Sequence, residues 1–421
     1  MSSRDFVQLA VLGVALEACL LGLRWLEPLD QHVPELVGLG LAAGLLYLLA
    51  AYRVLHTPRP ARSTLLLILV AAVAFRLTLV GVQPTLSDDL YRHQWEGRIQ
   101  VAGWNPYLVA PDDPRLAALR DEDFSRIPGP HVPSAYPPLA ELYFYGLAHV
   151  GGLPAFKWAA LGLDLAVIAL LLLLLRARGE PLARVLVYAW CPLVVLEFAG
   201  NGHYDALVVA ALLVANLLII GKRGLASMAA LAAAALTKWF AALLLPVFVL
   251  RTGWKWLAAF VGACALLVWP YADAGRRLIA GLVAYGEQWR NNESLFRLLH
   301  WAAQRDDVAA GLALGMVVGV MVFAAQQRTE PLRASYWLVG AILLLSPSVF
   351  PWYVTWLVPF LCFYPRAAGL LLSVTVLLAY HVVIGYRALG VWQYDPWLVA
   401  LEYLPVYALL MAQAFQKARQ K

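Results

Sequence analysis

The sequence has 421 residues, of which 62% are hydrophobic and 14% are charged. Soluble domains are about half apolar and about a quarter charged, so this composition excludes a soluble globular protein and predicts one embedded in a membrane. The formal net charge is +6, but the basic residues form short clusters between apolar runs, which is typical of membrane topology rather than of nucleic-acid binding.

The N-terminal end leads directly into an apolar run over residues 6–26, and no small-residue cleavage pattern precedes the next run. A cleaved signal peptide would carry such a pattern, so we expect an uncleaved signal anchor. All four cysteines lie inside apolar runs, which argues against a disulfide framework or a cysteine metal site. They are Cys19, Cys191, Cys264 and Cys362.

Apolar runs recur along the whole chain. Several are shorter than the roughly 20 residues that a helix needs to cross a bilayer, so we expect some hairpins that do not cross fully. The prediction is one all-α domain over residues 1–421, a polytopic transmembrane helix bundle with about 11–14 spans. The candidate spans are 6–26, 35–55, 64–83, 154–175, 185–199, 203–220, 224–237, 239–250, 255–272, 308–326, 334–348, 352–364, 367–385 and 396–415.

Clusters of Lys and Arg set the predicted orientation. All of them fall on one side of the membrane if the chain starts inside, so we expect both termini to be cytoplasmic. This parity requires the amphipathic stretch 137–151 to lie in the interface without crossing. The clusters are Arg53, Arg59 and Arg62; Arg176, Arg178 and Arg184; Lys222 and Arg223; Arg251 and Lys255; Arg328 and Arg333; Arg366; and Lys417, Arg419 and Lys421.

Two long loops then face outward, over residues 83–153 and 273–307. The first is rich in proline and aromatic residues, which predicts an ordered, packed loop. Long ordered loops usually carry function. The alternative is a lid that covers the bundle and has no chemistry of its own.

The first outer loop begins with two adjacent carboxylates, Asp88 and Asp89, followed by Arg92 and His93. Neighbouring carboxylates ionise together only with support from cations or hydrogen bonds, and Arg92 and His93 stand four residues after the two aspartates, one turn along a helix. One interpretation is a helix N-terminus capped by Ser87. The other is a general base beside cations that bind phosphate. A capped helix end is rigid enough to hold a base, so both can be true.

Further polar residues stand where later apolar runs end on the predicted outer side. Asn201, His203 and Asp205 lie in a glycine turn, which is either a capping turn or part of a site. A metal site is disfavoured, because one histidine and scattered carboxylates lack a ligand spacing.

A charge and a helix break inside apolar runs can likewise be structural or part of a site. Lys238 lies at or near membrane depth, so it needs a partner or a polar cavity unless it snorkels from a helix end. Pro347 and Pro351 interrupt an apolar run and free backbone groups that only protein or a cavity can cover. A binding site and a plain helix–turn–helix loop both fit this break.

These segments resemble a known family. The first outer loop of bacterial GT-C superfamily glycosyltransferases is similar to Ser-Asp-Asp-Leu-Tyr-Arg (87–92), Trp-Glu-Gly-Arg (95–98), Gly-Trp-Asn-Pro-Tyr (103–107), Ala-Pro-Asp-Asp-Pro (110–114), His-Val-Pro (131–133) and Tyr-Pro-Pro (136–138). The members in question are polyprenol-phosphate-mannose-dependent mannosyltransferases and relatives of family 87. Their Gly-His-Asn-Asp-Ala segment resembles residues 202–206, where Tyr204 replaces the usual Asn, and their later segments resemble residues 291–296 and 346–353.

The resemblance implies a helical membrane bundle that moves a hexose, by family mannose, from a polyprenyl-phosphate donor to a lipid or glycan acceptor at the outer face of the cell membrane. An aspartate at the start of the first outer loop is the family's catalytic residue. This role carries over to Asp88 or Asp89, and the resemblance does not choose between them.

Such a transfer suits the residues present. An acceptor hydroxyl loses its proton to a carboxylate base as it attacks the anomeric carbon, and direct displacement inverts that carbon. The leaving phosphate needs cations rather than a metal or another cofactor, and the candidates are Arg92, His93, His203, Lys238 and Arg290. The expected substrate-binding residues are Tyr91, Asn105, His131, Tyr136, Asn201, Asp205, Asn292, Glu293, Trp352 and Tyr353.

A transporter or lipid flippase is the main alternative, because it would also contain broken helices and charges inside the membrane. It is expected to show paired inverted repeats and a midplane site, whereas the unusual residues here belong to large loops on one side. A non-catalytic scaffold gives no reason for the paired aspartates. The expected partners are the donor, the acceptor and membrane lipids, with no nucleic acid.

Overall fold

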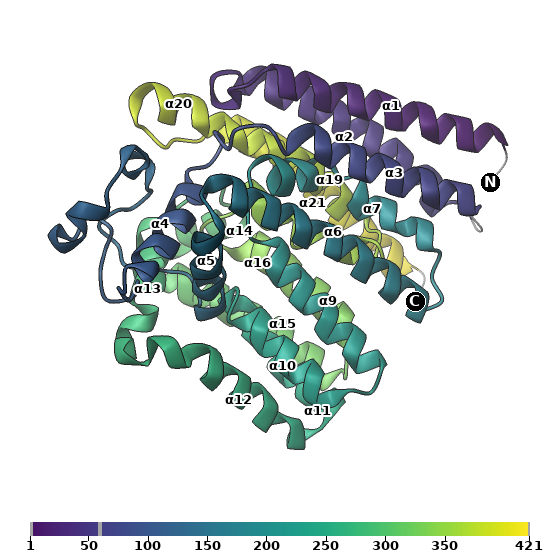
Figure 1. Cartoon of the computed structure of the whole chain (residues 1–421). Coiled ribbons are helices and arrows are strands. Elements are labelled where there is room, and N and C mark those ends of the chain that lie inside the picture. Colours follow the sequence, from purple (N-terminus) through teal and green to yellow (C-terminus); the bar gives the residue numbers. More distant parts are fainter. Residues whose placement is uncertain (1–2, 58–60, 420–421) are drawn as a thin grey trace.

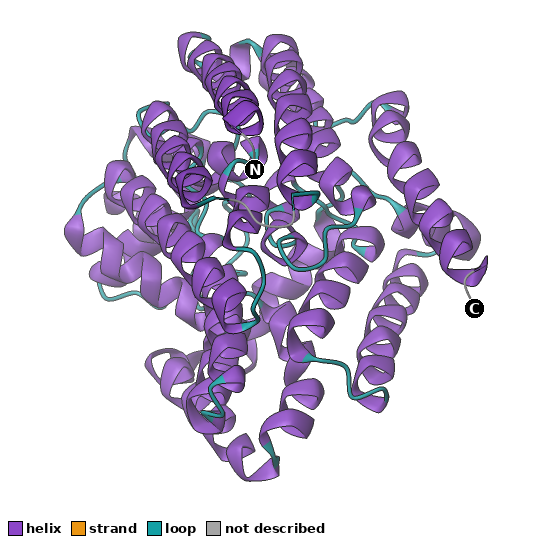
Figure 2. Ribbon diagram, turned by 90° about the vertical axis from the view of Figure 1, so that its right-hand side faces the viewer, coloured by secondary structure: helices purple, strands orange, loops and turns teal. Residues whose placement is uncertain are grey.

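The structure is a computed structural model that describes residues 3–57 and 61–419. Within these ranges every regular element is a helix, and the one isolated bridge of extended backbone joins Asn291 to Ser348. Figure 2 shows the helices and the loops that join them. The predicted all-α bundle is confirmed. Arg59 and Lys421, which belong to the predicted basic clusters, lie outside the described residues.

The first part of the chain forms α1 (Ser3–Trp25), α2 (Val33–Leu55), α3 (Arg62–Leu79), α4 (Asp89–Val101) and α5 (Pro138–Val150). The middle forms α6 (Leu153–Ala177), α7 (Leu186–Ala189), α8 (Pro192–Val195), α9 (Ala206–Ile220), α10 (Gly224–Ala235), α11 (Leu245–Thr252), α12 (Leu257–Val268) and α13 (Ala280–Gln288). The last part forms α14 (Leu295–Ala303), α15 (Asp306–Gln326), α16 (Pro331–Leu345), α17 (Pro351–Val354), α18 (Val358–Leu361), α19 (Ala367–Thr375), α20 (Val382–Leu389) and α21 (Pro396–Arg419).

Eight helices in the described ranges are long and apolar enough to cross a membrane, or up to nine if the bent pair Leu182–Ala189 and Pro192–Gly200 is one span. Four further apolar helices are shorter, with 10–17 residues, and these account for much of the difference from the predicted number of spans. The expected span over 352–364 is wrong. Two short helices replace it, and the second begins at Val358 with Pro359 in its first turn, because proline lacks the N–H that would continue the preceding hydrogen-bond ladder.

Loop helices gather at one end of the bundle, where Figure 1 shows α4, α5, α13 and α20. The bent pair turns by 62°, and α17 follows the break at Ser346–Phe350. The stretch predicted to lie in the interface forms the 13-residue helix α5, which packs against α4. Gly97 permits this contact, since a Cβ there would lie 2.4 Å from the carbonyl oxygen of Phe144.

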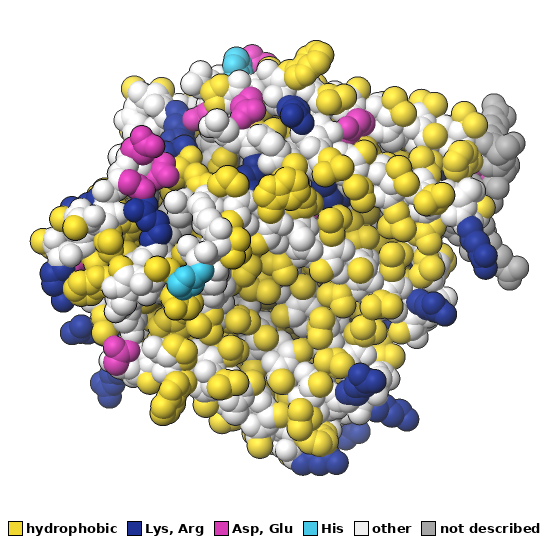
Figure 3. All heavy atoms as spheres, viewed as in Figure 1, with side chains coloured by type: hydrophobic (Ala, Val, Ile, Leu, Met, Phe, Trp, Pro, Cys, Tyr) yellow, Lys and Arg dark blue, Asp and Glu magenta, His cyan; other side chains and the backbone are white. Residues whose placement is uncertain are grey.

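The charges are distributed unevenly over the surface. Along the lower right edge of the face drawn in Figure 3, the charged side chains in view are Lys and Arg, whereas most acidic side chains in view lie toward the left. The turn between α9 and α10 carries Lys222 and Arg223, both exposed, and lies far along the bundle from the α4 end in Figure 1. Lys and Arg are also in view on the left, so what distinguishes the lower right edge is that acidic side chains are not seen there, and the predicted orientation stays a prediction.

A buried ion pair joins three helices inside the bundle. Arg76 of α3 donates two hydrogen bonds to Asp164 of α6, at 2.6 and 3.0 Å, and both side chains are 1% exposed or less. The Tyr188 hydroxyl of α7 donates to the same carboxylate at 2.8 Å, and Arg76 also donates to the carbonyl of Ala189. The charges are thus matched and hydrogen-bonded, which is the condition for placing them in a low dielectric.

Removing one member of this pair leaves the other charge buried and unpaired, which costs about 3–5 kcal/mol. We expect Arg76→Met and Asp164→Leu each to lower the midpoint of thermal unfolding in detergent, and the double variant to regain most of the loss. Arg305→Met, which removes an exposed pair with Asp307, is the control and should change the midpoint little. Additive losses in the double variant would contradict this interpretation.

Candidate active site

The start of α4 positions both aspartates. Asp88 occupies the N-cap position and Asp89 is the first helical residue. The N–H of Asp89 donates to the Ser87 hydroxyl at 3.2 Å. The predicted helix start is present, although Asp88 rather than Ser87 is the N-cap residue.

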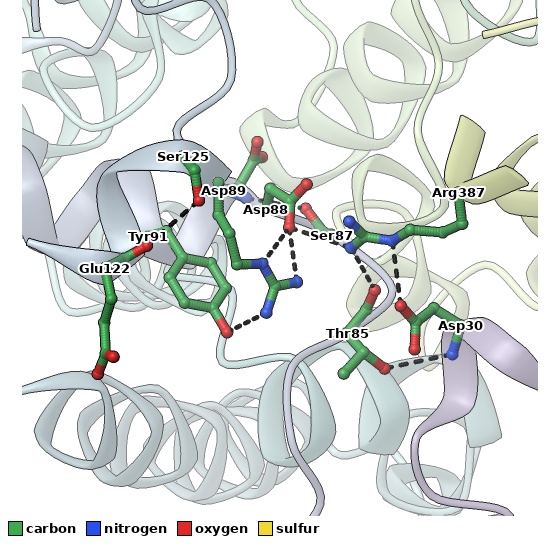
Figure 4. A network of polar contacts seen from close by, with 10 residues as sticks. Asp30, Thr85, Ser87, Asp88, Asp89, Tyr91, Glu122, Ser125 and Arg387 are labelled. Atoms are coloured by element: carbon green, nitrogen blue, oxygen red, sulfur yellow. Dashed lines mark hydrogen bonds and ion pairs between the residues drawn. The ribbon is translucent and has the colours of Figure 1, made fainter. Parts of the chain in front are cut away.

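Asp88 is held by two arginines that are remote in sequence (Figure 4). Arg126 donates to its Oδ1 at 2.7 and 3.1 Å, and Arg387 of α20 donates to the same atom at 3.1 Å. Arg387 also faces Asp30, 3.1 Å from its Nε. The expectation that Arg92 and His93 support the aspartates is therefore wrong for Asp88, because loop folding brings longer-range partners to it.

Asp89 has a different environment. Its carboxylate makes no hydrogen bond or ion pair with any residue in the described ranges, and no dashed line reaches it in Figure 4. Burial, which opposes the charged form, raises its pKa to about 7; the charge of Lys238 acts in the opposite direction. Asp89 is thus a free carboxyl group that titrates near neutral pH.

Two cavities meet at Asp89. We name them by their cations: the lysine cavity, of about 290 Å³, contains Lys238, and the arginine cavity, of about 460 Å³, contains Arg290 and Arg387. Both are of the size that holds a small ligand or part of a larger one. The residues that line both are Asp89, Pro128, Gly129, Trp289, Phe350 and Trp352. Asp89 is the one ionisable side chain among them, so it faces both spaces.

The lysine cavity presents its cation among aromatic rings. The Lys238 ammonium lies 3.1 Å from Asp205 and 4.5 Å from the ring centroid of Tyr204, and its side chain is 15% exposed. Trp356 donates to the same Asp205 oxygen at 2.7 Å. Lys238 thus has the partner that the sequence analysis expected, Asp205, and it also lines a cavity whose walls are mainly aromatic and apolar.

Arg92 lines this cavity but is committed to the protein. Its guanidinium donates to Glu96 at 2.6 Å, to the carbonyls of Pro128 and Gly129, and to the carbonyl of Val132 at 2.8 Å. These bonds fasten the loop 128–132 to α4. Arg92 therefore shapes the cavity wall.

Neither histidine of the expected phosphate set lines the lysine cavity or the arginine cavity. His93 stacks on Phe144 with ring centroids 4.5 Å apart, and burial lowers its pKa well below the usual value, so it stays neutral. His203 stacks on Trp352 at 4.2 Å, with its Nε2 3.4 Å from Glu197, and burial likewise lowers its pKa. His203 supports a wall residue from behind.

The other candidate residues divide into two groups. Those that line a cavity are Tyr136, Trp352 and Tyr353, besides the cation Arg290. The rest line neither cavity and bond to protein: Tyr91 to Arg126, Asn105 to Asp273, His131 to Gln288, Asn201 to Glu197, Asp205 to Lys238, Asn292 to Glu402 and Glu293 to Arg290. Most of the expected substrate-binding residues therefore do not border these two cavities.

Several lining residues were not predicted. Trp289, Tyr386, Arg387 and Trp392 line the arginine cavity. Trp289 lies in the predicted second outer loop, and the other three follow the expected span 367–385. Gly129 has φ +57°, and a Cβ there would lie 2.7 Å from the Trp289 ring. Glycine is therefore required where the first loop meets Trp289.

No group of three or more His, Cys, Asp or Glu side chains in residues 3–57 and 61–419 is arranged to hold a metal ion. The reaction's independence of metal stays a prediction.

The fold and the site together define a polytopic membrane protein whose cavities surround a free carboxyl group at a helix start. Residues 7–254, more than half of the chain, match the family model described as alpha-(1->6)-mannopyranosyltransferase, N-terminal domain. The chain belongs to this mannosyltransferase family, and it is a membrane glycosyltransferase that transfers mannose. A comparison with curated proteins finds no match. Membership favours the transferase over the transporter alternative.

The two aspartates should affect stability in opposite directions. Because the folded state raises the Asp89 pKa from 3.8 to about 7, ionised Asp89 destabilises the fold, and this cost grows as the pH rises between those values. Asp89→Asn should raise the thermal midpoint at about pH 8 and raise it less at about pH 5. Asp88→Asn should lower it at about pH 8, because Arg126 and Arg387 each lose one carboxylate partner.

Thermal unfolding of the detergent-solubilised protein at both pH values measures this. Asp112→Asn alters an exposed carboxylate and serves as the control. A lower midpoint for Asp89→Asn at about pH 8 would show that its carboxylate is paired in solution.

Proposed function

We propose that the protein transfers mannose from a polyprenyl-phosphate carrier to an acceptor hydroxyl, that Asp89 is the general base, and that the reaction inverts the anomeric carbon without a metal. The observation that supports this best is the contrast between the two aspartates. Asp88 is neutralised by Arg126 and Arg387, whereas Asp89 is unpaired in the described structure and borders both cavities.

In the proposed step the acceptor oxygen forms a bond to C1 of mannose while its proton passes to the Asp89 carboxylate. The bond between C1 and the phosphate oxygen breaks, and its electron pair leaves with the polyprenyl phosphate. A base with a pKa close to the working pH transfers protons efficiently. The family description names an α-(1→6) linkage; an inverting displacement that makes an α-mannoside requires a β-linked donor.

A lipid-carried donor is supported by the surroundings of the lysine cavity. Leu282 and Ile342 line it from α13 and α16, and α13 belongs to a candidate membrane span. Every regular element in the described ranges is helical, so they contain no α/β nucleotide-binding domain of the kind that serves nucleotide-sugar donors. Lys238 is the proposed cation for the leaving phosphate.

The proposed site faces outward, with both termini cytoplasmic. The support is the positive-inside rule applied to the clusters of Lys and Arg in the sequence, together with the edge away from the α4 end, where the charged side chains in view are Lys and Arg without acidic neighbours.

Substitution of the base tests the mechanism. In mannose transfer from a synthetic mannosyl-phosphoryl-polyprenol, Asp89→Asn should lower kcat by about 10²–10⁴-fold. Asp88→Asn should lower kcat less, because Asp88 is proposed to fix the start of α4 and not to take the proton. The wild-type kcat/KM should rise with pH through about 7 as Asp89 loses its proton, and EDTA should leave the rate unchanged. A larger loss in Asp88→Asn than in Asp89→Asn would exchange the two roles.

Cysteine labelling tests the orientation. Ser125, exposed beside the site, and Arg223, exposed in the turn between α9 and α10, are suitable positions. A membrane-impermeant maleimide should label Ser125→Cys in intact spheroplasts and Arg223→Cys only after permeabilisation. The unsubstituted protein, in which Cys19 and Cys264 are half-buried and Cys191 and Cys362 are buried, gives the background. The opposite labelling pattern would reverse the proposed orientation.

A further inference from the structure

The two cavities are separate spaces with one acid–base group between them. Their shared wall consists of Asp89, two backbone positions of the first loop and three aromatic rings. The base takes a proton from the acceptor hydroxyl, and the acceptor oxygen attacks the donor. Both substrates must therefore lie close to the base. A wall shared in this way allows donor and acceptor to approach Asp89 from different sides.

The cations in the two cavities differ in how many carboxylates already oppose them. Arg387 faces Asp30 and Asp88, and Arg290 pairs with Glu293 and Asp306. Lys238 has one carboxylate partner in the described structure, Asp205. An added phosphate therefore gains more attraction in the lysine cavity than in the arginine cavity.

The residues that line the two cavities also favour the donor in the lysine cavity. The lysine cavity is bordered by apolar side chains of bundle helices, among them Leu282 and Ile342. The arginine cavity is bordered mainly by loop residues and by the end of α20. An isoprenoid chain suits the first and a water-soluble substrate suits the second.

The arginine cavity combines aromatic rings with planar polar groups. Trp392 lies edge-on to Tyr386, with ring centroids 5.3 Å apart, and its Nε1 donates to Asn291 Oδ1 at 3.0 Å, so the indole is fixed in one orientation. Phe350 stacks on Trp352 at 4.6 Å. A hexose presents C–H groups on its faces and hydroxyls around its rim, so it can stack on such rings and bond to groups between them.

Arg387 supplies one such group. Its Nε faces Asp30, and its Nη2 donates to Asp88 and to the carbonyl of Thr85 at 3.0 Å. Its Nη1 makes no hydrogen bond to any residue that the structure describes. A guanidinium held on one side and free on the other is a preorganised donor to a sugar hydroxyl.

From these observations we propose that the arginine cavity is the acceptor site, that it takes an uncharged sugar residue against Trp392 and Arg387, and that the lysine cavity takes the donor. This assignment rests on the proposed transfer function and adds the acceptor class and the residues that recognise it.

The test uses one variant to change the acceptor KM and another to change the donor KM. With a short-chain mannosyl-phosphoryl-polyprenol and a series of uncharged α-mannosides, Trp392→Ala should raise the acceptor KM about tenfold, equivalent to about 1.4 kcal/mol, and leave the donor KM within about twofold. Trp392→Phe should restore most of the affinity. Lys238→Met should raise the donor KM and leave the acceptor KM within about twofold. Trp301→Ala removes an exposed ring of α14 and is the matched control for Trp392→Ala.

A binding measurement keeps the proposal independent of turnover. Saturation-transfer NMR should detect the mannosides on wild type and on Asp89→Asn, and a titration should give a dissociation constant about tenfold higher on Trp392→Ala. Loss of donor rather than acceptor affinity in Trp392→Ala would reverse the assignment. Turnover only with acyl-chain acceptors, unaffected by Trp392→Ala, would replace the sugar by a lipid. Mannosides that bind through Trp392 without any transfer by wild type would overturn the proposed function and leave the sugar site standing.

Discussion

The ion pairs of Asp88 join segments that are far apart in the chain. Asp88 precedes α4, Arg126 belongs to the first loop, Arg387 belongs to α20, and Arg387 in turn holds Asp30 between α1 and α2. The charges are matched while partly buried, so their desolvation is compensated. The N-terminus of α4 is thereby fixed between the N-terminal and C-terminal parts of the chain. Asp89, one residue on, inherits this fixed position and needs no partner of its own.

The membrane adds a second constraint, because backbone groups released at a helix break must find partners inside the protein. At the helix breaks around the site, backbone groups of one segment form hydrogen bonds with backbone groups of another. The N–H of Leu139 donates to Leu236 O at 2.8 Å, where α10 ends beside Lys238. The N–H of Asn291 donates to Pro347 O, and that of Val349 donates to Asn291 O at 2.9 Å. Backbone hydrogen bonds therefore join the start of α5 to the end of α10, and the second outer loop to the break before α17.

Much of the fold follows from the sequence, because apolar length, prolines and charge clusters are local signals. They predicted the all-α bundle, the break near Pro347 and Pro351, and a helix that begins at the two aspartates. The partners of those aspartates were not predictable in this way. Arg126 and Arg387 are 38 and 299 residues from Asp88, whereas helical spacing points to Arg92, which the structure uses to hold the loop 128–132. Trp289 and Trp392 were missed for the same reason: each lines the cavity only because distant loops meet. The roles of the candidate residues remain predictions until they are tested.

In the proposed arrangement, Asp89 is balanced between opposing influences. Burial and the neighbouring carboxylates Asp88 and Asp205 favour its protonated form, whereas Lys238 and Arg92 favour the ionised form. The free N–H groups at the start of α4 also favour negative charge there. A donor phosphate in the lysine cavity would oppose ionisation of Asp89 as a like charge, and Lys238, placed between that cavity and Asp205, would offset this effect by pairing with the phosphate. In this arrangement the lysine that receives the leaving group would also keep the proposed base ionised while the donor is bound, which gives a reason for a lysine beside Asp89 among aromatic rings.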